Sequence, residues 1–222
     1  MGGDGYARAR YGTWRQAMIR IVDYGLGNIN AFLNIYEALD IPAAAARTSE
    51  DLRDSLQIIL PGVGAFDWAM TRLNDSGMRE TLDELVLERK KPVLGVCVGM
   101  QMMAQSSDEG DLGGLGWLDA RVLGFNFSND PTTPLPHMGW NDVEPASDCS
   151  LFSGINDPTF YFLHSFFIEP TDRRDIASVT DYGGRFVSAV HHDNVYGTQF
   201  HPEKSHHWGV ALLRNFAAVA TC

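Results

Sequence analysis

Short apolar runs alternate with longer segments of helical periodicity through the first half of the chain. The run at 56–60 is mostly apolar and lacks a polar alternation, which is typical of a strand buried on both faces of a parallel sheet. Further strands are predicted at 19–23, 42–46 and 92–96, with helices at 28–39, 66–74 and 78–90. This β–α order with short turns predicts an α/β fold, with a three-layer, mostly parallel central sheet and helices on both faces.

The second half of the chain is richer in strand patterns. Strands are predicted at 121–125, 159–164, 177–181, 186–191 and 195–200, and a closing helix at 208–219. There is no internal repeat and no low-complexity segment, so residues 18–222 are expected to form a single domain. Residues 1–17 are Gly- and Arg-rich and contain no apolar signal-peptide core, and we expect them to be a poorly ordered N-terminal extension.

Composition narrows the class of protein. The 222 residues carry a net charge of −11, so they lack the basic footprint of a nucleic-acid or acidic-membrane binder. The three cysteines are odd in number and widely spaced, which suits reduced thiols and a cytoplasmic location. No apolar stretch approaches membrane-spanning length. No phosphate-binding loop, dinucleotide fingerprint or metal-ligand spacing is found, so we expect no cofactor and no metal.

The segment Gly95-Val96-Cys97-Val98-Gly99 places a cysteine between two glycines, after a strand pattern and before a helical one. A sharp strand-to-helix turn needs small flanking residues and lifts the thiol onto a helix N-terminus, where a thiolate is favoured. Such a segment is also compatible with a structural turn that holds a buried, inert cysteine. The decision between the two depends on whether the chain supplies a base.

His201-Pro202-Glu203 supplies such a base at the end of a strand pattern. A nucleophilic cysteine needs a histidine, and the histidine needs a group that holds its tautomer and orientation. Strand ends of a parallel sheet meet at one edge, so His201 and Cys97 are expected to lie close together. Alone, this tripeptide could be a polar exit from a strand. Together with the cysteine turn, it predicts an acyl-transfer triad of Cys97, His201 and Glu203.

Six motifs then occur in an order that resembles a known family. They are Asp23–Asn28, Pro61–Phe66, Gly95–Gln101, Pro136–Asn141, His164–Phe166 and Gln199–Ser205. Together they resemble the class I (triad) glutamine amidotransferases over residues 19–219. Within that family they are similar to the glutaminase subunits of imidazole glycerol phosphate synthase, an enzyme of histidine biosynthesis.

The resemblance implies a reaction and a set of roles. The Cys97 thiolate is expected to attack the side-chain amide of glutamine and release ammonia, and water then releases glutamate. Elbow geometry makes the Val98 N–H one oxyanion donor, and the resemblance places the other at Gly62 and Val63, in a segment that flips a peptide. The alternative is that Pro61-Gly62-Val63-Gly64 is an ordinary turn that ends a strand. The resemblance assigns the glutamine pocket to Gly64, Gln101, His164, Ser165 and Phe166. A buried, helix-capping role for Gln101 is the alternative.

The resemblance also implies a partner. The glutaminase is expected to form a heterodimer with a (β/α)8 cyclase subunit, which receives ammonia through a tunnel and makes imidazole glycerol phosphate and AICAR. Positions that match the family's interface or gate are Asn28, Trp140, Tyr161 and Lys204. Trp140, in what reads as a Gly-Trp-Asn turn, is expected to be an exposed docking anchor, with a core tryptophan as the alternative.

Some details differ from the histidine-pathway pattern. Val98 stands where leucine is usual, and His164-Ser165-Phe166 replaces the commoner His-Ser-Tyr. The segments 116–120 and 204–209 are more similar to paralogues that supply ammonia to a sugar amidotransferase in surface-polysaccharide biosynthesis, which is the alternative function. A regulatory module that has lost catalysis is disfavoured by the intact triad. A cysteine peptidase would share the turn but would not need Gln101 or Trp140.

Overall fold

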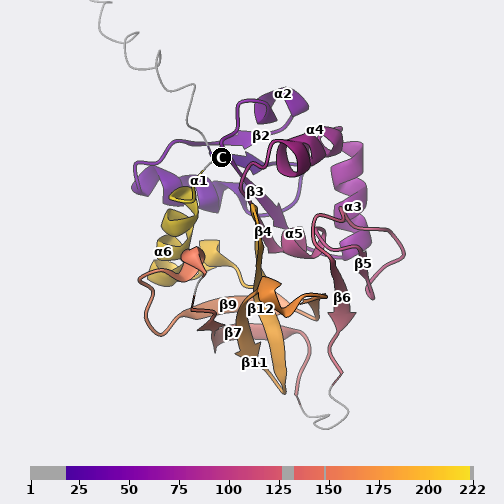
Figure 1. Cartoon of the computed structure of the whole chain (residues 1–222), viewed down its shortest axis with the longest axis vertical. Coiled ribbons are helices and arrows are strands. Elements are labelled where there is room, and N and C mark those ends of the chain that lie inside the picture. The colour runs from indigo at the N-terminus through magenta and orange to yellow at the C-terminus, as the bar shows by residue number, and fades with distance from the viewer. Residues whose placement is uncertain (1–18, 127–132, 148, 221–222) are drawn as a thin grey trace, which may run out of the picture.

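A central sheet of eight strands organises the part of the chain that the computed structural model describes, residues 19–126, 133–147 and 149–220 (Figure 1). In spatial order its strands are β2 (Ala43–Ala46), β1 (Ile19–Val22), β3 (Gln57–Gly62), β4 (Val93–Cys97), β13 (Val195–Thr198), β12 (Arg185–His192), β11 (Ile176–Asp181) and β8 (Glu144–Pro145). Pairing is parallel from β2 to β13 and antiparallel from there to β8. The prediction for residues 1–17 lies outside the described residues.

Helices cover both faces of the parallel part, as the sequence predicts. In Figure 1, α1 (Ile29–Ala38) and α6 (His206–Ala217) lie on one side of β3 and β4, and α3 (Phe66–Asp75) and α4 (Arg79–Asp83) lie on the other. Short helices complete the set: α2 (Ser49–Leu52), α5 (Val98–Gln101), and the 3-10 turns η2 (Ser150–Phe152), η3 (Arg173–Asp175) and η4 (Pro202–Lys204). None of the helices in the described ranges is long and apolar enough to cross a membrane.

Strand β3 shows why a polar residue belongs in this core. Ile58, Ile59 and Leu60 are fully buried, and Gln57 at the start of the strand is almost equally buried. The Gln57 amide donates to the carbonyls of Phe216, Ala217 and Val219 at the end of α6. Carbonyls at a helix end lack intrahelical partners, so the glutamine caps the helix and fixes α6 against the sheet.

Two small sheets stand beside the central one and belong to the strand-rich half. One pairs β10 (Phe166–Pro170) with β6 (Ala120–Gly124) and β5 (Ser106–Ser107), and the other pairs β7 (His137–Asp142) with β9 (Thr159–His164). Strands β7 and β10 are absent from the sequence prediction. The expectation of a turn at Gly139-Trp140-Asn141 is wrong, because these residues form the middle of β7 and pair with β9.

Three predicted helices differ from the observed ones. The segment 78–90 becomes α4 followed by a π-helical stretch, η1 (Glu84–Glu88). The helical pattern expected after the cysteine segment gives only the short α5, which ends at Gln101, because the carbonyls of Met102 and Ala104 accept the N–H groups of Leu115 and Gly116 instead. The last helix begins at His206, two residues before the predicted start.

Candidate active site

Cys97 ends β4 in a strained backbone conformation. Its φ is 55° and its ψ is −117°, although it is not a glycine. A Cβ on Gly99 would come within 1.9 Å of the Leu60 carbonyl oxygen, so the turn passes too close to β3 for any side chain there. Backbone strain of this kind persists only where the surroundings impose it, and it is frequent at functional sites. The structure thus has the strand–turn–helix elbow that the sequence predicts.

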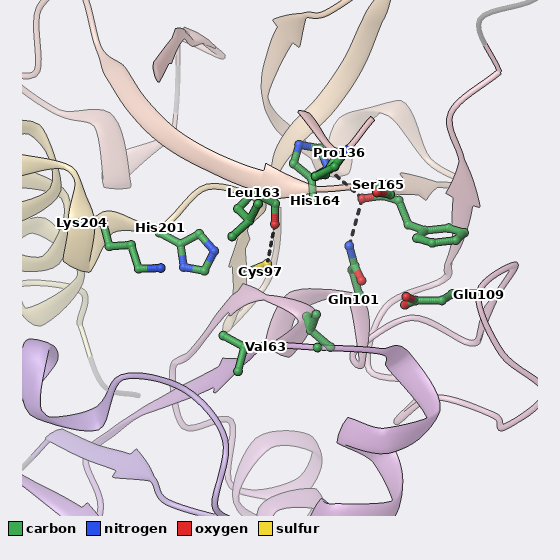
Figure 2. A pocket seen from close by; sticks show the side chains of 13 residues that line it. Val63, Cys97, Gln101, Glu109, Pro136, Leu163, His164, Ser165, His201 and Lys204 are labelled. Atoms are coloured by element: carbon green, nitrogen blue, oxygen red, sulfur yellow. Dashed lines mark hydrogen bonds between the residues drawn. The ribbon is translucent and has the colours of Figure 1, made fainter. Parts of the chain in front are cut away.

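The thiol faces a cavity of about 360 Å³ (Figure 2). Its lining consists of Val63, Gly64, Cys97, Val98, Gln101, Glu109, Pro136, Leu163, His164, Ser165, Phe166, His201 and Lys204. All five residues predicted to bind glutamine are in this set, as are two of the three predicted oxyanion residues. Glu109, Pro136 and Leu163 have no site role in the sequence prediction, although Pro136 begins the motif Pro136–Asn141.

His201 and Glu203 form a buried pair at the end of β13. Nδ1 of His201 lies 2.9 Å from Oε1 of Glu203, and their side chains are 2% and 3% exposed. Burial alone would lower the pKa of His201, but the attractions of Cys97 and Glu203 outweigh it and raise that pKa to about 10. Because Nδ1 is held by the carboxylate, Nε2 is left to exchange a proton with the thiol.

The backbone around His201 is held firmly in place. Its N–H donates to the Tyr161 carbonyl of β9 at 2.9 Å, and its own carbonyl accepts from the Ser205 hydroxyl at 2.6 Å. Within the described chain, His201 Nε2 and Glu203 Oε2 are buried atoms without a hydrogen-bond partner. The side of the ring that is not held by Glu203 is thus uncommitted to other protein groups.

The sulfur of Cys97 has two polar neighbours besides His201. Sγ lies 3.9 Å from the Leu163 carbonyl oxygen, to which a thiol donates (Figure 2), and 3.7 Å from Nε2 of Gln199. Gln199 is fully buried and was not among the candidate residues of the sequence. The Gln-Phe-His-Pro-Glu run contains it, but only the folded chain shows that its amide reaches the cysteine.

The predicted oxyanion segment lies next to the elbow. Gly62 ends β3 and is the parallel partner of Cys97, although it does not line the cavity. Val63 follows it with a partly exposed side chain, and Gly64 has a φ of +88°. Just upstream, the Tyr24 hydroxyl donates to the Pro61 carbonyl at 2.7 Å, so the strand is fixed up to the glycines. The peptide flip expected from the sequence would therefore have to lie in the short stretch from Gly62 to Gly64.

The opposite wall contains two buried histidines in contact. His137 Nδ1 lies 2.9 Å from His164 Nε2, and His164 Nδ1 lies 2.8 Å from the Phe166 carbonyl oxygen. Burial lowers the pKa of His137 to about 4 and that of His164 to about 3. Both rings are therefore neutral near pH 7. The sequence prediction placed His164 in the pocket and assigned no role to His137.

Three of the four predicted interface residues lie together. The Trp140 ring is 45% exposed, stands edge-on to Tyr161 and stacks on His206, and Lys204 Nζ lies 5.7 Å from the centre of the Tyr161 ring. The expectation of an exposed Trp140 holds, and the core alternative is wrong. The fourth residue, Asn28, caps α1 by accepting the Ala31 N–H.

Comparisons with known proteins agree with this geometry. The sequence model of the family "Glutamine amidotransferase class-I" matches residues 21–220. The chain is 56% identical to "Imidazole glycerol phosphate synthase subunit HisH" of Bdellovibrio bacteriovorus over 91% of this chain and 100% of that protein. It is 50% identical to the protein of the same name from Leptospira interrogans, again over 91% of this chain and 100% of that one.

Solved structures show the same fold at low sequence identity. A putative GMP synthase protein of Thermoplasma acidophilum matches with a TM-score of 0.68 and 22% identity, covering 91% of this chain and 93% of that one. A structure described as "Crystal structure of glutamine amidotransferase" matches with a TM-score of 0.70 and 19% identity, over 90% of this chain and 99% of that one.

Proposed function

Because this chain belongs to the class I glutamine amidotransferases, we propose that it is the glutaminase subunit of an imidazole glycerol phosphate synthase. It hydrolyses L-glutamine to glutamate and ammonia and passes the ammonia to a cyclase subunit in histidine biosynthesis. One observation supports this most strongly: Cys97 and a buried His201–Glu203 pair meet at one cavity in a chain that spans the whole length of relatives named as this subunit. These relatives do not favour the sugar-amidating alternative.

The triad residues divide the reaction between them. In the ion pair that the raised pKa of His201 describes, Nε2 has taken the thiol proton of Cys97, and the thiolate attacks the side-chain amide carbon of glutamine. The same nitrogen then gives its proton to the departing ammonia, which leaves a thioester on Cys97. Water, deprotonated by His201, hydrolyses the thioester to glutamate. Glu203 holds the His201 ring through Nδ1 and stabilises its cationic form.

The cavity supplies the remaining contacts. The Val98 N–H, next after the nucleophile, donates to the tetrahedral oxyanion, and a peptide of the Gly62-Val63 segment donates once it has rotated. We assign the binding of the α-amino and α-carboxylate groups of glutamine to Gly64, Gln101, His164, Ser165 and Phe166. A cavity of about 360 Å³ fits a ligand of this size.

The docking surface for the cyclase is the cluster formed by Trp140, Tyr161 and Lys204, together with Asn28. An exposed tryptophan backed by a second aromatic ring and a lysine is a typical binding anchor. Residues 18–222 make up the one domain of this enzyme, which acts in the cytoplasm without a cofactor or metal.

The test is glutamate release from glutamine by the chain alone, with the cyclase, and with the cyclase plus its nucleotide substrate. We expect slow release alone and a large stimulation by cyclase and nucleotide together, because the oxyanion donor must be completed. If Cys97 reacts with a glutamine-like electrophile but the cyclase and nucleotide give no stimulation, the histidine-pathway role is wrong and only the glutaminase assignment survives.

A further inference from the structure

Gln199 lies at a position where its side chain touches the reacting atom. It follows β13 directly and is fully buried, and its Nε2 lies 3.7 Å from Cys97 Sγ. This distance is normal for an N–H group that donates to sulfur. The amide of a glutamine can face either way, however, and only one orientation offers the sulfur a donor.

The neighbouring hydrogen bonds decide that orientation. The Phe166 carbonyl can only accept, so the Gln101 atom that faces it at 3.0 Å must be the nitrogen. The same Gln101 nitrogen lies 3.0 Å from Gln199, so the Gln199 atom at that contact must be the oxygen. It follows that the Gln199 nitrogen faces Cys97. The Phe166 carbonyl thus fixes the orientation of the Gln101 amide, which in turn fixes that of the Gln199 amide and places its nitrogen next to the sulfur.

The two buried histidines extend the same chain of hydrogen bonds. Because the Phe166 carbonyl also accepts from His164 Nδ1, His164 Nε2 has no proton and must accept from His137 Nδ1. His137 Nε2 then accepts from the Asn141 amide, which also donates to the Asp181 carbonyl. Each group has one consistent role, so the network holds Gln101 and Gln199 in a single arrangement.

From this arrangement we propose that Gln199 is a fourth catalytic residue, whose amide N–H stabilises the Cys97 thiolate. The inference rests on the proposed function. When His201 removes the thiol proton, the sulfur gains a negative charge and the Gln199 N–H bond to it becomes charge-assisted. When the sulfur bonds to the amide carbon of glutamine, that charge passes to the oxyanion. When the thioester breaks, the sulfur departs as a thiolate and meets the same donor again.

Other titratable groups also lie around the cysteine. Those that line the cavity or act on the charge of Cys97 are Tyr24, Glu109, His164, His201 and Lys204. His201 must move its proton during the reaction, Oε2 of Glu109 accepts the Phe66 N–H, and the Tyr24 hydroxyl donates to the Pro61 carbonyl. Gln199 is uncharged at every pH, so the donor it offers is constant through the cycle.

The experiment measures alkylation of Cys97 by iodoacetamide in the full chain between pH 5.5 and 10.5, read at each cysteine by mass spectrometry. Gln199→Met keeps the length of the side chain and removes the donor. Gln57→Met is the matched control, because Gln57 is another buried amide whose three acceptors lie at the end of α6. Cys149, which is buried outside the cavity, is the reference thiol within each sample.

We expect Gln199→Met to slow the alkylation of Cys97 roughly 10- to 100-fold at pH 7, the range for a hydrogen bond to a charged group. The difference between variant and wild type should shrink as the pH rises, because the lost donor acts on the ionisation of the thiol. Gln57→Met and Cys149 should show no such change. A loss of the same size at every pH would mean a distorted site, and that result overturns the proposal, as does an unchanged profile.

A second variant keeps the proposal testable if Gln199→Met does not fold. Gln199→Glu retains the oxygen that accepts from Gln101 but turns a carboxylate oxygen toward the sulfur, so at pH 8 Cys97 should react even more slowly than in Gln199→Met. Alkylation as fast as in the wild type would overturn the proposal. Failure of the glutaminase assignment gives a different pattern: wild-type Cys97 would then react no faster than Cys149 at pH 7. Failure of the histidine-pathway role alone leaves the alkylation results unchanged and shows only as a lack of stimulation by cyclase and nucleotide.

Discussion

The two walls of the cavity hold buried histidines in opposite electrostatic settings. On the wall formed after β13, His201 has its pKa raised to about 10, with Glu203 at 2.9 Å and Cys97 close by. On the wall formed by β7 and β9, burial lowers the pKa of His137 to about 4 and that of His164 to about 3. All three rings are similarly inaccessible to water. Burial alone therefore does not decide the charge state, because the neighbours of His201 reverse the effect that keeps His137 and His164 neutral.

The difference lies in what each ring faces. His201 faces a carboxylate and a thiol, both of which stabilise an imidazolium. For His164, burial is the main cause that lowers the pKa; the hydrogen bond to the Phe166 carbonyl offsets only part of it, and the charges of His137 and His201 lower the pKa further. The neutral wall can thus donate hydrogen bonds without competing for the proton that His201 must move. The wall that contains His201 can transfer a proton, whereas the wall that contains His137 and His164 keeps its hydrogen bonds in one arrangement.

The largest expected effect comes from removing the Cys97 thiol, the nucleophile of the proposed reaction. Cys97→Ala should lower glutamate release in the cyclase complex by at least about 10³-fold, because loss of the nucleophile removes the covalent route. Cyclase binding should be unchanged, since Cys97 lies inside the cavity. Cys149→Ala is the control and should retain activity. Substantial turnover by Cys97→Ala under saturating cyclase would contradict the assigned nucleophile.

Glu203→Gln should make the electrostatic environment of His201 more like that of the neutral His137 and His164. The substitution removes the charge that supports the His201 cation, so the pKa of His201 should fall, and kcat should drop by about 10²- to 10⁴-fold. The measurement is the pH dependence of glutamate release together with the NMR titration of His201. An unchanged pKa of His201 would show that Cys97 alone holds the proton there, and the comparison of the two walls would need to be revised.

The strand and turn that carry Cys97 could be predicted well from the sequence, whereas the wall formed by β7 and β9 could not. Strand β4, the turn and Cys97 are encoded in adjacent residues, because a glycine-flanked elbow is a local requirement. Strand β7 exists only through its pairing with β9, and its Gly139-Trp140-Asn141 centre has turn composition. No local pattern could therefore identify it as a strand.

Gln199 illustrates the same limit within the site. Its contact with the sulfur joins residues 102 positions apart in the chain, and its orientation depends on the Phe166 carbonyl on another strand. A motif search finds the triad because those residue types have an unmistakable chemistry. A glutamine is chemically neutral and common, so its role becomes visible only when its neighbours are placed around it.

A pH titration of stability distinguishes the walls directly. The lowered pKa of His137 means that its contribution to folding is complete above the unfolded value of 6.5 and is lost as the pH falls toward about 4. In His137→Gln, which cannot take up that proton, the loss of unfolding free energy over this range should be smaller by up to about 3 kcal/mol. Denaturant unfolding at several pH values measures it. An equally steep acid limb in the variant would mean that His137 is not held neutral.

Strand β7 has a buried face and an exposed face. The smallest expected effect comes from a substitution on the exposed face. His137 points into the buried network, whereas the Trp140 ring is exposed and packs on Tyr161 and His206. Trp140→Ala should weaken cyclase binding about 10- to 30-fold by titration calorimetry, as for a central aromatic anchor, and should leave the acid limb of stability unchanged. Trp68→Ala is the matched control, because Trp68 is 55% exposed on α3 with Arg72 over its ring. Equal losses of affinity in the two variants would show that β7 is not part of the docking surface and that it only supports the buried network of His137.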